Sequence, residues 1–132
     1  MKEGKTLLPD TNVILRYLLQ DDENQYKKAF VFFEKIRQGN RNAVMLESVL
    51  VECVYVLLKF YNVPRKDISR PLQGILHYKG IVNTDREALV EALKIFTETQ
   101  FDIVDILLFA KAQHQGMEVF SFDRDLQKLS KK

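Results

Sequence analysis

The apolar residues of this chain follow two patterns that alternate from one end of the sequence to the other. Short apolar runs bounded by turn residues predict strands. Longer stretches, in which apolar residues recur every three or four positions, predict amphipathic helices. The predicted strands are residues 5–10, 42–45, 81–83 and 119–121, and the predicted helices are residues 11–20, 26–38, 49–60, 64–80, a segment after residue 85, 101–115 and 124–129.

Several residues are placed where helices are expected to begin, end or bend. Gly39 and Gly116 directly follow predicted helices, and glycine commonly ends a helix because it adopts the left-handed conformation easily. Thr84 and Asp85 can cap the helix that comes after them. Pro71 lies inside a predicted helix, which we expect it to kink or restart because proline lacks a backbone donor.

The order of these elements predicts the fold class. Strands that alternate with helices are typical of an α/β protein, in which a short parallel sheet of about four strands is flanked by helices. The sequence contains no internal repeat and no stretch with the composition of a linker. We therefore expect residues 1–132 to form a single domain.

Composition narrows the class of protein further. A chain of 132 residues of which 46% are apolar can bury a core, which excludes a disordered protein. No run of eighteen apolar residues is present, so no membrane span is predicted. Residues 1–6 lack the apolar stretch of a signal peptide, and the single cysteine, Cys53, has no internal disulfide partner. Both features predict a cytoplasmic protein.

Four acidic residues occupy positions that the requirements of folding do not explain by themselves. Asp10 and Asp123 each follow a predicted strand, and ligands of α/β sheets bind at the carboxyl ends of the strands. Glu52 and Asp105 lie between apolar residues of predicted helices, where an ionised carboxylate is costly unless it has a partner. A divalent cation would offset the repulsion among these carboxylates. The pattern therefore predicts a metal site that acts on phosphate esters.

Each of these acids also has a purely structural interpretation. Asp10 and Asp123 could be helix N-caps. Glu52 could point outward or pair with a base, and Asp105 could interact with the dipole of its own helix. The bases near Glu52 in the sequence are Lys59 and Arg65. The combination of four such acids favours the metal site over four separate structural roles.

The segments that contain the four acids resemble the four motifs of PIN-domain nucleases, in the same order and at similar spacing. These segments are residues 10–18 (DTNVILRYL), 50–57 (LVECVYVL), 102–108 (DIVDILL) and 120–126 (FSFDRDL). Two departures are that Ile103 and Val104 stand where the third motif usually has Phe and Ala, and that Ser121 stands where the fourth usually has Thr. The sequence is most similar to the VapC branch, the toxins of bacterial and archaeal toxin–antitoxin pairs.

The resemblance implies a three-layer α/β/α fold and an endoribonuclease that depends on Mg²⁺ or Mn²⁺. By position in the motifs, the metal-binding and catalytic acids are Asp10, Glu52, Asp105 and Asp123. Asp102 matches a frequent further acid of the third motif and is expected to bind metal as well. Thr11, Asn12 and Ser121 match polar positions that orient ligands or water. The resemblance also implies a homodimer, inhibited by a small antitoxin protein.

The distribution of charge is compatible with an RNA substrate. The formal net charge is +2, but setting four acids aside from the 18 acidic residues leaves 14 of them against 20 basic residues, a balance that suits a polyanion. The bases chosen as candidates for contacts with RNA phosphates are Arg16, Lys59, Arg65, Lys111 and Arg124. The alternatives that stay open are an inactive PIN-like binding module and a nuclease of the same fold that acts in RNA processing or on DNA.

Overall fold

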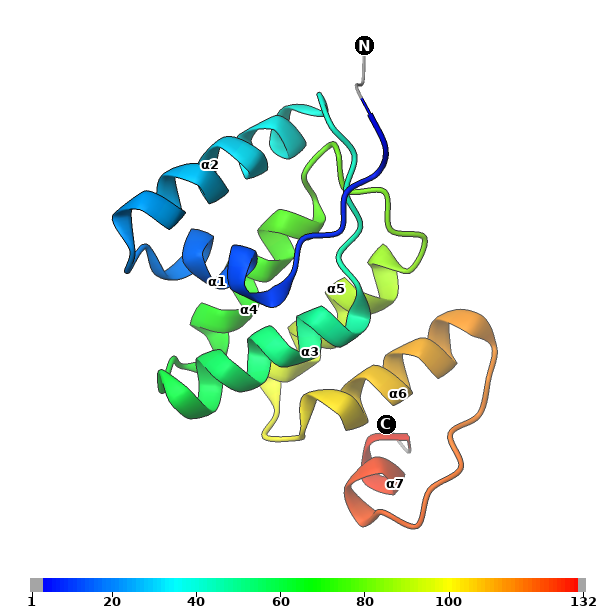
Figure 1. The fold of residues 1–132 in the computed structure, drawn as a ribbon. Coiled ribbons are helices and arrows are strands. Elements are labelled where there is room, and N and C mark those ends of the chain that lie inside the picture. The colour runs from blue at the N-terminus through cyan, green and yellow to red at the C-terminus, as the bar shows by residue number, and fades with distance from the viewer. Residues whose placement is uncertain (1–3, 131–132) are drawn as a thin grey trace.

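The structure is a computed structural model that describes residues 4–130, and most of these residues are helical (Figure 1). Residues 1–3, half of the N-terminal stretch examined for a signal peptide, lie outside the described residues. The helices are α1 (Thr11–Leu19), α2 (Glu23–Gln38), α3 (Glu47–Tyr55), the π-helical turn η1 (Val56–Phe60), α4 (Arg65–Leu76), α5 (Arg86–Glu98), α6 (Ile103–Gln115) and α7 (Arg124–Ser130). Within residues 4–130, no helix has the length and apolar character needed to cross a membrane.

The predicted sheet is reduced to two contacts between extended segments. Over residues 4–130, the bridges found are Leu7 with Ala43 and Ala43 with Ile81, and both are parallel. Two backbone hydrogen bonds of 2.8–3.0 Å accompany each bridge. Three of the four predicted strands therefore lie side by side in parallel, with the segment around Ala43 in the middle. Because each contact is a single residue pair long, the four-stranded sheet is not confirmed.

The fourth predicted strand, residues 119–121, makes no bridge in the described structure, so this prediction is wrong. After Gly116, whose φ of 65° is left-handed, the chain runs clear of the other extended segments and enters α7 (Figure 1). Leu126 and Leu129 of α7 are buried. Phe120 and Phe122 are 88% and 89% exposed. The C-terminal segment is thus anchored by the leucines of α7 and not by strand pairing.

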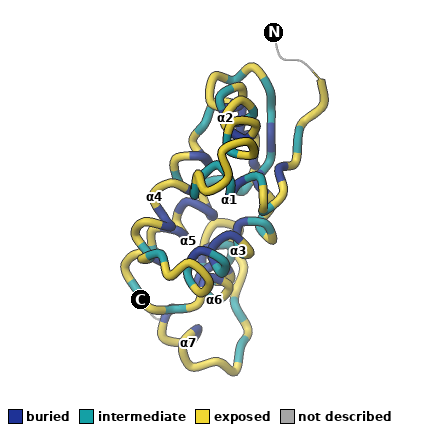
Figure 2. Tube along the Cα trace, turned by 60° about the vertical axis from the view of Figure 1, so that its left-hand side comes forward, coloured by how far each residue is buried: buried dark blue, intermediate teal, exposed yellow. Residues whose placement is uncertain are grey.

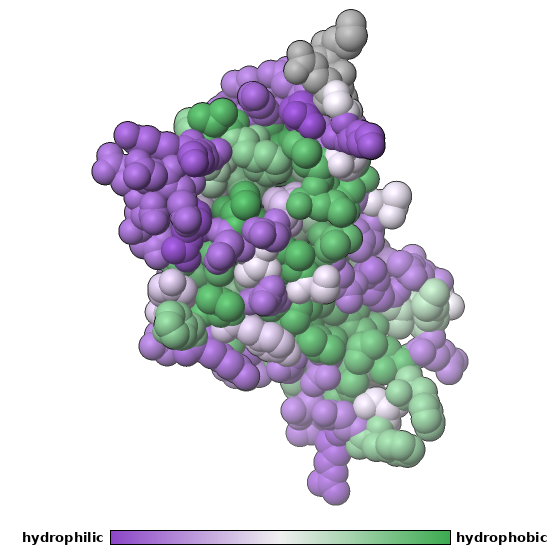
Figure 3. Space-filling view, viewed as in Figure 1, coloured by the Kyte–Doolittle hydropathy of each residue, from purple (hydrophilic) through white to green (hydrophobic). Residues whose placement is uncertain are grey.

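The core lies where the helices meet, and Figure 2 shows buried positions concentrated along the inner sides of α3 to α6. Gly80 lets the second and third extended segments approach the end of α2, since its N–H donates to the carbonyl of Ile36 at 2.7 Å. In Figure 3 hydrophilic side chains cover the outer side of α2, whereas hydrophobic side chains gather over α6 and the chain that leads to α7. The largest fully buried side chains include Phe33, Phe96, Ile14, Ile36, Met45, Leu50, Ile68 and Leu72.

Most predicted helix ends agree with the structure, and two local details differ. Gly39 and Gly116 both end helices in the left-handed conformation, as expected. However, α4 runs through Pro71 without a break, and the proline is exposed on its surface, so the helix does not restart there. Asp85 precedes α5 but makes no capping bond with its side chain. Its carboxylate instead accepts hydrogen bonds from Asn83 at 2.9 Å and Lys111 at 3.2 Å.

Candidate active site

Asp10 stands between the first extended segment and α1. Its extended backbone makes it the N-cap of that helix, and Oδ1 accepts a hydrogen bond from the backbone N–H of Val13 at 3.0 Å. This is the structural interpretation that the sequence left open. A cap occupies one carboxylate oxygen and orients the other. The cap therefore fixes the position of Asp10 at the end of the segment that pairs with Ala43.

Glu52 reaches the same region from α3. The hydroxyl of Thr11 donates to Oε1 of Glu52, which joins the first turn of α1 to the middle of α3. Glu52 is exposed and not buried among apolar residues, and over residues 4–130 it forms no ion pair with a base. Burial and then the charges of Glu52 and Asp10 raise the pKa of the Cys53 thiol to about 12. Both acids therefore act electrostatically on the same buried thiol.

Asp10 and Glu52 face a common depression between α1 and α3, which we call the acidic groove. Its volume is about 630 Å³. The residues that line it are Asp10, Thr11, Asn12, Leu15, Arg16, Val49, Glu52, Val56, Phe60 and Tyr61. The groove thus has an acidic end at the start of α1 and an aromatic end at η1.

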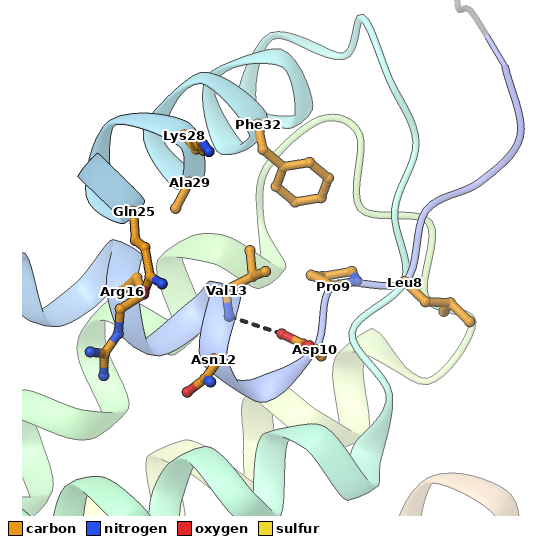
Figure 4. A pocket seen from close by; sticks show the side chains of 10 residues that line it. All are labelled: Leu8, Pro9, Asp10, Asn12, Val13, Arg16, Gln25, Lys28, Ala29 and Phe32. Atoms are coloured by element: carbon orange, nitrogen blue, oxygen red, sulfur yellow. Dashed lines mark hydrogen bonds between the residues drawn. The ribbon is translucent and has the colours of Figure 1, made fainter. Parts of the chain in front are cut away.

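A second cavity of about 490 Å³ adjoins this groove between α1 and α2, and Figure 4 shows the side chains that line it. Asp10, Asn12 and Arg16 line both the cavity and the groove. Arg16 pairs with Asp21 at 3.1 Å, while its Nε is buried without a hydrogen-bond partner among the described residues. Lys28 adds a second cation on the α2 side. A concave surface that combines hydrogen-bonded carboxylates with nearby cations is suited to binding a phosphate ester.

The other acids gather around the first turn of α6. Burial of Asp105, followed by repulsion from Asp123, Asp102 and Asp125, raises the pKa of its carboxyl group. Oδ1 of Asp102 accepts from the N–H of Val104 at 2.9 Å and from the hydroxyl of Tyr55 at 2.7 Å. Asp105 is therefore the acid of this group whose carboxyl pKa is raised, and a raised pKa is a property of many catalytic carboxyl groups.

Asp123 is held by its own turn at the start of α7. Its N–H donates to Oγ of Ser121 at 2.9 Å, and its Oδ1 accepts from the N–H of Asp125 at 2.7 Å. Ser121 therefore orients the backbone of Asp123, while its predicted role toward a ligand or water stays a prediction. Asp123 also lies within electrostatic range of Asp105.

The structure thus divides the predicted acids into two groups. One group, Asp10 and Glu52, lines the acidic groove, and the other, Asp102, Asp105 and Asp123, surrounds the start of α6. Over the part of the chain that the structure describes, no three side chains of the metal-binding types are placed to hold one ion. The carboxylate oxygens have the right chemistry for a hard divalent cation, although no three of these side chains converge on one point among residues 4–130.

The five candidate RNA-binding bases have different surroundings. Arg65 donates to the carbonyls of Phe96 and Thr99 at 3.0 and 2.9 Å, and its guanidinium lies 4.0 Å from the centre of the Phe96 ring. Lys111 pairs with Glu47 at 2.9 Å and with Asp85 at 3.2 Å. These two side chains hold neighbouring elements together in this structure.

The other three candidate bases have different surroundings. Lys59 lies 5.1 Å above the ring of Tyr55, Arg124 is exposed at the start of α7, and Arg16 lines the acidic groove. Sequence reasoning missed Tyr55 and Phe60 as residues near the acids. Tyr55 lies three positions after Glu52, so helical spacing was the signal that places it close to that acid.

Comparisons with known proteins agree on one family. The sequence profile of the PIN domain family matches residues 7–132. The chain is also similar to a VapC ribonuclease of Aquifex aeolicus (strain VF5), with 32% identity over 124 residues, which is 92% of this chain and 90% of the relative. A search among solved structures gave no match.

Proposed function

Because the chain belongs to the PIN domain family, we propose that it is a ribonuclease, and that it is the toxin of a toxin–antitoxin pair. The observation that carries the proposal is the acidic groove, in which Asp10 and Glu52 lie together beside Arg16. A similar chain over nine-tenths of its length is a VapC ribonuclease, which supports the same activity here. The family match over residues 7–132 supports treating the chain as one catalytic domain.

The proposed reaction is hydrolysis of an RNA phosphodiester bond. A water oxygen forms the new bond to phosphorus, the bond from phosphorus to the 3′-oxygen breaks, and the products carry a 5′-phosphate and a 3′-hydroxyl. Water gives up a proton to a carboxylate, and the departing 3′-oxygen takes one up. Asp105 is one candidate for this role, because burial and repulsion from neighbouring carboxylates raise the pKa of its carboxyl group in the metal-free chain.

The proposal includes a requirement for a divalent cation, Mg²⁺ or Mn²⁺. The predicted ligands are Asp10, Glu52, Asp102, Asp105 and Asp123, all of which offer the hard oxygen atoms that these ions prefer. When bound, such an ion stabilises the charge that builds up on phosphorus oxygens. The chain's own contribution in the groove is to hold Glu52 through the hydroxyl of Thr11 and Asp10 through the N–H of Val13.

A cleavage assay tests the proposal directly. A 5′-labelled single-stranded RNA is incubated with the wild-type chain in Mg²⁺, in Mn²⁺ and in EDTA, and then with Asp105→Asn and Glu91→Gln. Glu91 is an exposed acid of α5 whose pocket contains none of the predicted catalytic acids, so it is the matched control. We expect Asp105→Asn to lose at least about 10²-fold in rate, a typical loss for an acid–base group, and Glu91→Gln to cleave normally. Full activity of Asp105→Asn, or full activity in EDTA, contradicts the proposal.

A second function is favoured by one observation, the division of the acids into two groups with no metal-holding set among residues 4–130. A PIN-like module that binds RNA without cutting it needs the groove but not the metal. The same assay separates the two functions, because the binding module retains the labelled RNA and leaves it intact under every metal condition.

The proposed partners follow from the same family membership. They are an RNA substrate, a small antitoxin protein and a second copy of this chain. The aromatic residues of α2 are the surface predicted to meet a protein partner, since Phe30 is 42% exposed and its ring centre lies 6.0 Å from that of Tyr26. The cytoplasmic location stays a prediction from the sequence.

A further inference from the structure

The acidic groove ends at two exposed aromatic rings. Phe60 is 76% exposed and Tyr61 is 37% exposed, although both line a groove that also contains catalytic candidates. Their ring centres are 5.0 Å apart and their planes are 77° apart, an edge-to-face pair. We propose that these two rings form a stacking platform for an unpaired base of the RNA substrate, an inference that rests on the proposed ribonuclease function.

The core does not require Phe60. Leu57, in the same turn, is 3% exposed and already supplies the contact of η1 with the core. A phenylalanine that leaves three-quarters of its surface in water gains little from folding. Its ring is instead free to bury that surface against a flat apolar ligand.

The backbone of η1 fixes where the two rings lie. The N–H of Tyr61 donates to the carbonyl of Val56 at 3.2 Å, five residues back, which is the hydrogen bond of a π-helical turn. Such turns occur frequently at functional sites. The next bond, from the N–H of Val63 to the carbonyl of Leu57 at 2.9 Å, closes the turn and holds the chain at Asn62, whose φ of 55° is left-handed. The platform is therefore attached to ordered backbone.

The position of the rings relative to the acids suits an extended strand of RNA. Glu52, Val56 and Phe60 lie on one side of α3 and η1, since all three line the groove. Eight residues of helix separate Glu52 from Phe60, which corresponds to roughly 12 Å along the axis. A phosphate near Glu52 therefore places the base of a neighbouring nucleotide within reach of Phe60. Arg16, on the α1 side of the groove, supplies positive charge for the backbone of the strand.

Stacking explains how this site would select unpaired RNA. A base that is paired inside a duplex has both faces covered, whereas a base in a loop or a single strand exposes a face to an aromatic side chain. Stacking tolerates all four bases, because each has an aromatic face. The platform thus predicts a preference for single strands with little selection of sequence at the stacked position.

The test measures binding and cleavage separately. A single-stranded RNA that contains the fluorescent base 2-aminopurine at one position is titrated with the Asp105→Asn chain, alone and combined with Phe60→Ala, Phe60→Leu or Phe60→Trp. A control is Met117→Ala, which removes another large exposed apolar side chain that lies outside the groove. Cleavage by the corresponding variants that retain Asp105 is measured in parallel, together with the molar mass of each variant in solution.

We expect Phe60→Ala and Phe60→Leu to weaken RNA binding about 5- to 150-fold, which is the range for the loss of one stacked base. The quenching of 2-aminopurine should disappear in both variants and be retained in Phe60→Trp and Met117→Ala. The slope of log affinity against log salt should stay unchanged, because no phosphate contact is removed.

Two results would overturn the platform alone. One is wild-type affinity and quenching in Phe60→Ala while the parent chain still cleaves RNA. The other is a change of oligomeric state in Phe60→Ala at unchanged RNA affinity, which assigns the rings to a protein interface. If the wild-type chain neither binds nor cleaves RNA, the proposed function fails, and the platform fails with it.

Discussion

At the scale of single residues, the predicted catalytic acids also have structural roles. Asp10, Asp102 and Asp123 each accept a backbone N–H at the start of a helix, so their capping role, left open by the sequence for two of them, is confirmed by geometry. A carboxylate at the start of a helix also interacts favourably with the positive end of the helix dipole. The chain therefore uses one set of interactions both to begin helices and to position negative charge.

Asp105 differs from these capping acids, and its surroundings predict how stability depends on pH. Its folded-state pKa is raised by burial and by repulsion from Asp123, Asp102 and Asp125, so its ionised form is less stable in the folded chain than in the unfolded chain. The penalty is present above the folded-state pKa and is relieved as the pH falls through it.

We therefore predict that Asp105→Asn is more stable than the wild-type chain at pH 7, and that the difference shrinks as the pH is lowered. Urea unfolding of both proteins in EDTA, at pH 7 and at several lower values, measures this. A variant that is less stable than wild type at pH 7 would mean that Asp105 is stabilised by its surroundings, in conflict with the structure.

At the scale of elements, periodicity predicted the helices well because each buries one apolar face. The ends were also predictable where glycine supplies a left-handed residue, as at Gly39 and Gly116. Strands were harder to predict because a strand of three or four residues needs a partner, and the sequence does not specify which segment lies beside it. Ile81 has that partner in Ala43, whereas residues 119–121 have none within the described structure.

Gly80 offers a quantitative test of how the extended segments pack against the end of α2. A Cβ atom at residue 80 would lie 2.1 Å from the carbonyl oxygen of Arg41 and 2.7 Å from that of Ile36, both on the backbone. We predict that Gly80→Ala destabilises the fold by at least about 1–3 kcal/mol, the usual cost of overpacking. Gly74 is the control, since it lies within α4 and a Cβ there meets no atom within 4 Å.

Gly74→Ala should stabilise the chain by about 0.5–1 kcal/mol, because alanine favours the helix and restricts the unfolded chain. Urea unfolding of the two variants beside the wild type measures both effects. Equal stability of Gly80→Ala and wild type would show that the extended segments around Ala43 and Ile81 do not approach α2 as described.

At the scale of the whole molecule, one part of the predicted arrangement of the acids is present in the structure and another part differs from it. The motif positions of Asp10 and Glu52 predicted that they lie close together, and they share the acidic groove. Asp123 was expected beside Asp10 because both follow predicted strands. In the structure the charge of Asp123 acts on Asp105. Phe60 and Tyr61 were missed because their exposure depends on the π-helical turn, which hydrophobic periodicity does not reveal.

The central claim is that the carboxylates around the groove cut RNA, and a pair of matched substitutions tests it most directly. Asp10 and Asp22 are both helix N-caps that accept a backbone N–H at 3.0 Å, but only Asp10 of the two lines the acidic groove. Asparagine caps a helix about as well as aspartate, so both Asp10→Asn and Asp22→Asn should unfold within about 0.5 kcal/mol of wild type.

The measurement is the rate at which each variant cleaves a labelled single-stranded RNA in Mg²⁺ or Mn²⁺. We expect Asp22→Asn to cleave at the wild-type rate and Asp10→Asn, although equally stable, to lose at least about 10²-fold in rate. Wild-type cleavage by Asp10→Asn, or an equal loss in both variants, would contradict the central claim.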